Sequence, residues 1–234
     1  MRKYISLLIL LLTSAYSYSQ DASPTVSFYD TEQSSDVTLQ ANEAGSSTAP
    51  LEITCTGNIT PNGYNYVAYW DIQRTTINGT EEILQRYEDD TNYTLTLSGS
   101  YSVYLNITFT HDGDTIIFKN EPITITIAES SLQCPNGFSP NGDRINDVFN
   151  IKCKSIIKLD AKIFNRWGKL LYTMNLDNYE SGWDGRVGGK VVKDGIYFVQ
   201  VKATGSDGLK YNIKRTVSVL KGLREKENSG TTEN

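Results

Sequence analysis

The chain has 234 residues, of which 21% are charged, and a formal net charge of −5 at pH 7. This length can hold two domains of ordinary size, and the single histidine excludes any metal site built from several histidines. Phosphate-binding and dinucleotide-binding glycine patterns are absent, and so is the G-x-S-x-G word of serine hydrolases. We therefore predict that the chain is not an enzyme and needs no catalytic cofactor.

Residues 1–19 have the pattern of a secretory signal peptide. Arg2 and Lys3 precede an apolar run over residues 5–12, and small residues follow that run. The run is too short for a membrane helix, which needs about 20 apolar residues. We expect cleavage after Ser19 and a mature chain that is exported and does not span the membrane.

The mature chain divides into an acidic half and a basic half. Residues 20–131 carry 16 acidic and 3 basic side chains, a net of −13, whereas residues 132–221 carry 8 acidic and 15 basic ones, a net of +7. This contrast predicts two separate domains, 20–130 and 131–221, followed by a polar flexible tail over 222–234. Lysines alternate along strand-like segments of the basic half, as they do on a solvated sheet face, so we expect no nucleic-acid binding.

The acidic half has many strand signals and few helix signals. Its short runs of alternating or β-branched residues, separated by Gly, Asn, Asp and Pro, predict an all-β sandwich. The runs cover residues 25–29, 51–56, 66–72, 93–97, 101–109 and 123–127.

One spacing in this half is typical of immunoglobulin domains. Cys55 precedes Trp70 by 15 residues, and Tyr101 stands two residues before Val103. In immunoglobulin domains a strand-B Cys precedes the strand-C Trp by about this distance, and a corner Tyr stands two residues before the second Cys. The half therefore resembles an immunoglobulin-like or PKD-like domain in which Val103 replaces the second cysteine and Cys55 is a buried free thiol.

Tyrosines are frequent around Trp70, at positions 64, 66, 69 and 87. They are either ordinary tyrosines of a β-sheet or an aromatic surface that contacts a sugar or a protein. The one histidine, His111, belongs to F-T-H-D-G-D, which predicts a hairpin tip.

The basic half also consists of strand-like runs separated by turn words. The runs cover residues 148–153, 159–167, 169–174, 196–203 and 211–220. The predicted fold class is thus all-β, with two consecutive immunoglobulin-like β-sandwich domains. The junction over 129–133 is short, so we expect the domains to lie end to end with limited freedom.

Four sequence words distinguish the basic half. They are F-S-P-N-G-D-R-I-N-D-V-F (138–149), I-F-N-R-W-G (163–168), G-W-D-G (182–185) and D-G-I-Y (194–197). In this order they resemble the gliding-motility-associated C-terminal domain family of Bacteroidota, the type B sorting domain of type IX secretion substrates. The resemblance covers residues 134–221, and its sorting-motif residues here are Pro140, Asn141, Gly142, Asp143, Asn165, Arg166, Trp167, Gly168, Trp183, Asp184 and Gly185.

This resemblance implies export across the outer membrane to the cell surface or the medium. Its implied partners are the type IX translocon and an outer-membrane β-barrel protein, and its implied setting is gliding motility or adhesion. We expect a small non-enzymatic surface or secreted protein. Two alternatives stay open: an accessory subunit that remains bound to the export or motility machinery, and a polysaccharide-binding accessory protein. Members of the family usually end near the residue that is Lys221 here, so the tail is a departure from the pattern.

Cys134 and Cys153 bracket the S-P-N-G-D loop and are the disulfide candidates. Exported proteins meet oxidising surroundings, and paired cysteines around this loop occur in the resembled family. The alternative is two separate buried thiols.

The loop after Pro140 gathers oxygen-bearing side chains, which suit a hard cation such as calcium. The candidate ligands are Asn141, Asp143, Asn146 and Asp147. An EF-hand-type loop would need a glutamate twelve positions along, where Lys152 stands. In the alternative interpretation, which we favour, these side chains cap backbone N–H groups and fix tight turns.

Two tryptophans stand in the sorting words. Trp167 and Trp183 are most simply core or corner aromatics beside glycines that adopt positive φ. Arg166 could stack on a tryptophan or pair with Asp184. The alternative is that this region is the surface that the export machinery reads.

One modification word occurs in the acidic half. Asp114-Thr115-Ile116 resembles the acceptor word of Bacteroidota O-glycosylation, which would place a sugar on Thr115.

Overall fold

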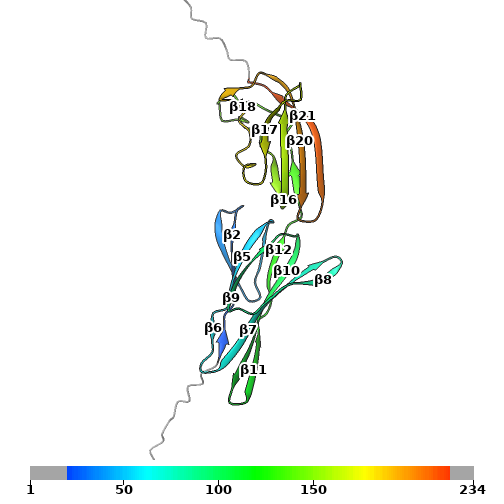
Figure 1. Ribbon diagram of the computed structural model, residues 1–234. Coiled ribbons are helices and arrows are strands. Elements are labelled where there is room, and N and C mark those ends of the chain that lie inside the picture. Colours follow the sequence, from blue (N-terminus) through cyan, green and yellow to red (C-terminus); the bar gives the residue numbers. More distant parts are fainter. Residues whose placement is uncertain (1–19, 222–234) are drawn as a thin grey trace, which may run out of the picture.

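The computed structural model describes residues 20–221, and every regular element in that range is a β-strand. The expected signal peptide over 1–19 and the expected tail over 222–234 lie outside the described residues. Within residues 20–221, no helix has the length and hydropathy that crossing a bilayer requires. The all-β expectation is confirmed, and the strands form two bodies with separate cores that lie end to end (Figure 1).

The larger sheet of the N-terminal domain has the order β4-β12-β10-β7-β8, with β11 beside β10. Its strands are β4 (Ala44–Ser47), β7 (Asn65–Thr76), β8 (Gly79–Arg86), β10 (Gly99–His111), β11 (Asp114–Lys119) and β12 (Ile123–Ile127). β4 runs parallel to β12, and the other pairs are antiparallel.

Part of this sheet extends past the sandwich as a three-stranded arm formed by β10, β11 and the start of β7 (Figure 1). Its tip is the turn at Asp112 and Gly113, whose φ angles of 47° and 93° are both positive. Two-residue hairpins of type I′ need this geometry, and Asp and Gly adopt it readily. The predicted hairpin tip beside His111 is therefore confirmed.

The second sheet of this domain has the order β3-β2-β5-β9. Its strands are β2 (Thr25–Asp30), β3 (Ser35–Gln40), β5 (Leu51–Thr56) and β9 (Asp90–Leu95), and a short pair joins β1 (Asp21–Ala22) to β6 (Ile59–Thr60). Alternation along β5 buries Leu51, Ile53 and Cys55 and exposes the residues between them. The two sheets thus enclose one apolar core.

The immunoglobulin-like features of the sequence are present in this core. Cys55, Trp70 and Val103 are all 0% exposed, and Cys55 is a free thiol whose pKa burial raises to about 12. The Tyr101 hydroxyl donates to the carbonyl of Leu97 at 2.8 Å, which is the tyrosine-corner bond. Strand order and corner together confirm an immunoglobulin-like sandwich.

The C-terminal domain has one five-stranded sheet in the order β14-β21-β20-β16-β17. Its strands are β14 (Gly137–Phe138), β16 (Ile156–Phe164), β17 (Leu170–Met174), β20 (Gly195–Gly205) and β21 (Lys210–Val219). β14 runs parallel to β21, as β4 does to β12. A second tyrosine corner stands at the start of β20, since the Tyr197 hydroxyl donates to the carbonyl of Lys193 at 2.7 Å.

Loops and short strand pairs cover the inner face of this sheet. The pairs are β13 (Ser131–Gln133) with β15 (Lys152–Lys154) and β18 (Arg186–Val187) with β19 (Lys190–Val191). Between them, Phe149 and Trp183 form an isolated antiparallel bridge with two N–H···O bonds of 2.9 and 3.0 Å. Trp183, which is 1% exposed, fills the centre of the core under the sheet.

The two domains meet through hydrogen bonds and one ion pair. The Ser155 hydroxyl accepts from the Ala49 N–H at 3.2 Å, and the Ser98 N–H donates to the carbonyl of Ser206 at 3.2 Å. Lys154 pairs with Glu32 at 2.9 Å, which joins the basic domain to the acidic one. These contacts fix the end-to-end arrangement seen in Figure 1.

Candidate functional site

Two of the four sequence words build the core of the C-terminal domain. In G-W-D-G, the Trp183 indole N–H donates to the carbonyl of Arg186 at 3.0 Å, and its ring lies 5.4 Å from the Phe138 ring. Gly182 has a φ of +62°, and a Cβ there would lie 2.6 Å from the carbonyl oxygen of Phe149. The chain therefore passes too close to the neighbouring strand for any other residue. The core interpretation of Trp183 is confirmed.

The loop after Pro140 is organised around the Asp147 carboxylate. Its two oxygens accept from the backbone N–H groups of Gly142 at 2.7 Å, Asn141 at 2.9 Å and Arg144 at 2.7 Å. These bonds, that from Gly142 foremost, hold the pKa of the Asp147 carboxyl below its usual value. A negative charge surrounded by backbone donors fixes the loop.

The other candidate metal ligands also bond within the loop. Asp143 accepts from the Ile145 N–H at 2.7 Å and from the Asn141 side-chain amide at 2.8 Å. The Asn146 carbonyl accepts from the Ser139 N–H at 2.7 Å. Within residues 20–221, no cluster of three or more His, Cys, Asp and Glu side chains could hold a metal ion. The bonds support the turn-fixing interpretation. Calcium binding stays a prediction that a calcium titration of the melting temperature tests.

The word N-R-W-G forms the turn between β16 and β17. The Asn165 side chain accepts from the N–H groups of Trp167 at 3.0 Å and Lys169 at 2.9 Å, and Gly168 has a φ of 77°. This turn projects Trp167 outward, where 77% of it is exposed. Of the two interpretations of Trp167, core or corner, the structure supports the corner, because Asn165 holds its position in the turn and most of the side chain is exposed.

Arg166 and Asp184 do not pair with each other. The Arg166 guanidinium lies over the Trp167 ring at 4.7 Å, so the predicted stacking on a tryptophan is confirmed. Asp184 instead lies 3.6 Å from Arg186 and accepts from the Arg186 backbone N–H.

Trp167 belongs to an exposed apolar surface, which we call the Trp167 surface. Its other members are Leu170, Ile196 and Phe198, which are 45%, 59% and 46% exposed. Phe164 on β16 pairs with Leu170 on one side and Phe198 on the other, which makes the surface continuous across three strands. An open pocket of about 620 Å³ lies between the N-R-W-G turn and the D-G-I-Y segment. The structure thus brings these two words together at the surface.

Sequence reasoning missed Leu170, Ile196 and Phe198 as members of this surface. The alternation along β20 contains the signal, because Tyr197, Val199 and Val201 face the core and therefore turn Ile196 and Phe198 outward. A patch of this kind, rimmed by polar groups, is typical of an interaction site.

The two candidate disulfide partners lie in the same core cluster as free thiols. The β13–β15 register pairs Leu132 with Cys153, and Cys134 follows directly after the end of β13. Burial raises the pKa of both thiols, that of Cys153 to about 11. The bridge stays a prediction.

In the N-terminal domain, the candidate residues lie mostly on the arm. The His111 ring lies against Tyr64 with 5.1 Å between ring centroids and a tilt of 43°, and its Nε2 lies 3.4 Å from a carboxylate oxygen of Asp112. Thr115 is exposed on β11 beside the hairpin tip, opposite Thr110. Its glycosylation stays a prediction.

Comparison with known proteins gives one family match. Residues 132–217 match the family described as the CHU_C type IX secretion signal domain. A search of the curated proteins finds no match.

Several solved structures match the chain at low identity and low TM-score. Dimeric latent PorU from Porphyromonas gingivalis is 11% identical with a TM-score of 0.25, and the match covers 85% of this chain and 20% of that one. The Bacteroides ovatus mixed-linkage glucan protein SGBP-B is 15% identical with a TM-score of 0.27, over 77% of this chain and 43% of that one. The chicken CNTN1 FN1–FN3 domains are 12% identical with a TM-score of 0.29, over 78% and 69%. This chain therefore spans less than half of the first two.

The family match covers all four sequence words and ends within β21, two residues before that strand does. It confirms the resemblance drawn from them, and it indicates that the chain is a type IX secretion substrate, exported across the outer membrane to the cell surface or the extracellular space.

Proposed function

We propose that this protein is a small non-enzymatic surface or secreted protein linked to adhesion or gliding motility. In this proposal the C-terminal domain is the export address, and the N-terminal sandwich is the cargo. The type IX translocon and an outer-membrane β-barrel partner would read the address through the Trp167 surface. The observation that carries the proposal is the 77% exposure of Trp167 in a domain whose other tryptophan is buried.

Physical chemistry supports an interface at this surface. Covering Trp167, Ile196 and Phe198 removes apolar area from water, and tryptophan is among the residues that contribute most to binding energy. The surface is also rigid, because Asn165 holds the turn and the other members lie on strands. A rigid aromatic anchor loses little conformational entropy when a partner covers it.

An export assay in the native host tests this role. We expect Trp167→Ala to reduce the fraction of protein outside the outer membrane and to raise the periplasmic fraction, with the fold unchanged by circular dichroism. Ile117→Ala is the matched control, because Ile117 is 78% exposed on the arm of the N-terminal domain. Normal export of Trp167→Ala and of a Trp167→Ala/Phe198→Ser double variant would remove the Trp167 surface from the proposal.

Adhesion is supported by the exposed face of the arm. Val67 on β7 and Ile117 on β11 both pair with Thr108 of β10, which places them on the same face of the arm with Thr108 between them, and they are 58% and 78% exposed. Such a row on a projecting element suits contact with another surface. We expect Val67→Ser/Ile117→Ser to lower cell attachment while export stays normal. Unchanged attachment would count against this role of the arm.

The second candidate is an accessory subunit that stays bound to the export machinery. The same exposed Trp167 surface favours it, because a partner that covers the surface could remain there after export. Pull-down of the surface-exposed protein separates the two. Co-purification of outer-membrane barrels that Trp167→Ala abolishes supports the accessory role, and release into the medium supports the first.

A further inference from the structure

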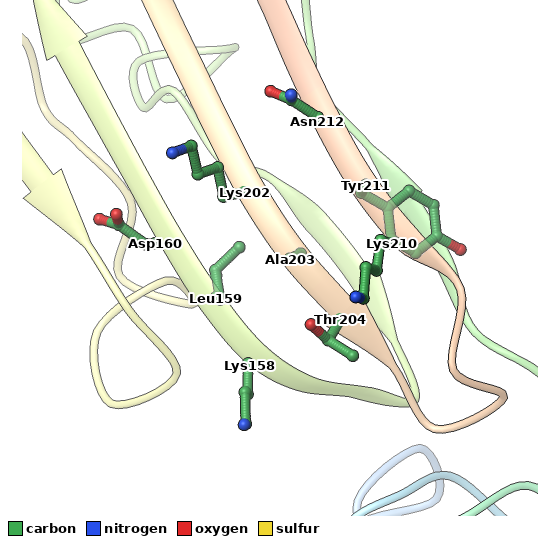
Figure 2. Close-up of a pocket in the computed structure, with 9 residues that line it drawn as sticks. All are labelled: Lys158, Leu159, Asp160, Lys202, Ala203, Thr204, Lys210, Tyr211 and Asn212. Carbon is green, nitrogen blue, oxygen red and sulfur yellow. The ribbon is translucent and has the colours of Figure 1, made fainter.

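The outer face of the C-terminal sheet carries five lysines on three adjacent strands. They are Lys158 and Lys162 on β16, Lys202 on β20, and Lys210 and Lys214 on β21. Each alternates with residues that turn toward the core, so its side chain leaves the sheet on the solvent side. Figure 2 shows Lys158, Lys202 and Lys210 on these neighbouring strands around an open pocket of about 460 Å³. We call these five residues the lysine face.

The strand register places Lys202 at the centre of the lysine face. Lys202 pairs with Asp160 on one side and with Asn212 on the other. The other four lysines stand two residues before and after those two partners. They therefore occupy the four diagonal positions around Lys202, which lie about 7–8 Å away in a sheet.

The stability of the sheet does not favour this arrangement. Across the outward positions of β16, β20 and β21, all of which the structure describes, Asp160 is the one carboxylate, and it already pairs with Lys162 at 2.8 Å. Neighbouring like charges on a sheet face are destabilising, and exposed ion pairs add little stability. An anionic ligand would attract all five lysines, so the electrostatic energy of the lysine face would become favourable when the ligand is bound.

The residues between the lysines indicate the class of anion. Gln200, Thr204 and Asn212 share the face with the lysines and offer neutral donors and acceptors that suit hydroxyl groups. The outward positions between the five lysines hold no aromatic side chain, and the outward Phe164 and Phe198 stand beyond Lys162 and Gln200, at the end of the rows. Single-stranded nucleic acids are held by aromatics that lie among the basic residues and stack on successive bases. A glycan with carboxylate or sulfate groups combines the two chemistries that the face offers.

We propose that the lysine face binds an acidic polysaccharide. Its acidic groups would lie among the ammonium groups around Lys202, and its hydroxyls would bond to the amides and the threonine between them. Since the chain is exported to the cell surface or beyond, it reaches the compartment where such glycans are found. The proposal goes beyond the proposed function, because it uses no residue of the Trp167 surface.

Binding to labelled glycans tests the proposal on the mature chain from residue 20 to residue 234. Dextran sulfate and dextran share a backbone and differ in charge, and polygalacturonate supplies carboxylates in place of sulfates. We expect binding to dextran sulfate or polygalacturonate, none to dextran, and an affinity that falls as salt screens the charges. Lys202→Glu should weaken binding about tenfold or more, because it reverses the central charge.

The matched control is Lys190→Glu, which makes the same charge change at an exposed lysine on β19, away from the lysine face. It should weaken binding less than about twofold, since its charge acts only at a distance. An equal loss in both variants would show a net-charge effect and overturn the site. Binding to anionic phospholipid vesicles or to single-stranded DNA without binding to either acidic glycan would also overturn it.

Discussion

The two domains build the same sheet and cover it differently. In both, a short first strand runs parallel to the last strand at one edge, and a hairpin strand forms the other edge. The hydroxyls of Tyr101 and Tyr197 each donate to the carbonyl of the residue four positions earlier in the chain. Each of these tyrosines also stands two residues after a glycine with positive φ. The shared frame shows that one topology serves both halves of the chain.

The two domains differ in the layer that packs against this sheet. In the N-terminal domain, β5 and β9 pair over six residues within a four-stranded sheet. In the C-terminal domain, the isolated Phe149–Trp183 bridge and a loop clamped by Asp147 stand in that layer. In the regular sheet of the N-terminal domain, many residues each contribute a little to stability. In the second layer of the C-terminal domain, a few residues make most of the stabilising contacts. Several of the family's sequence words lie in this irregular layer, where the N-terminal domain has a regular second sheet. Their specific residues stand out in the sequence because each makes a particular contact there.

The largest expected effect is on Trp183. Trp183→Ala should lower the free energy of unfolding of the C-terminal domain by about 3–5 kcal/mol, because it leaves a large cavity under the sheet. Urea denaturation measures the loss. Trp167→Ala is the control and should change stability by less than about 0.5 kcal/mol, as exposed substitutions do. A loss below about 1 kcal/mol in Trp183→Ala would mean that the loops stay packed on the sheet without the indole of Trp183.

The predicted Cys134–Cys153 bridge is next in size. It would close a loop of about 20 residues and stabilise the C-terminal domain by about 3 kcal/mol in the chain-entropy model. The N-terminal domain, whose single thiol is Cys55, should not respond to reductant. Mass spectrometry of the exported protein without reduction should show a peptide containing both cysteines. A free thiol on Cys134 would refute the bridge.

The tyrosine corners test whether the domains unfold separately. Tyr101→Phe and Tyr197→Phe each remove one hydroxyl bond and should cost about 1–2 kcal/mol. Each loss should appear only in the unfolding transition of its own domain, which hydrogen exchange can assign. If either substitution lowers both transitions equally, the junction couples the two domains into one unit.

The smallest expected effect is on the stability of the C-terminal domain at low pH. The pKa of Asp147 is lower in the folded protein than the ordinary value of 3.8, so its charge stabilises the C-terminal domain above that value. This contribution should fade as the pH falls below 3.8 toward the depressed folded pKa. Asp147→Asn should flatten the acid limb of the C-terminal transition and leave the N-terminal one unchanged. An unaltered acid limb would contradict the clamp.

Sequence patterns predicted the N-terminal domain better than the C-terminal one. Alternation and the spacing of Cys55, Trp70 and Tyr101 specify a sandwich, because in a regular sheet the face follows from the period of two. In the C-terminal domain, Trp167 and Trp183 both stand beside glycines in turn words. Only the fold decides that Asn165 directs one outward and that Phe149 holds the other inward. Periodicity carries no information about irregular loops.

The end-to-end arrangement of the domains has a mechanical consequence. The ends of the described chain lie at opposite ends of the molecule, and β16, β20 and β21 run roughly along the line between them (Figure 1). A pull between a contact near Gln20 and an anchor near Lys221 would load the strands lengthwise. Hydrogen bonds of β21 to β20 would then resist in shear, many at once, instead of opening one after another. A molecule loaded in this way resists tension between contacts at its two ends.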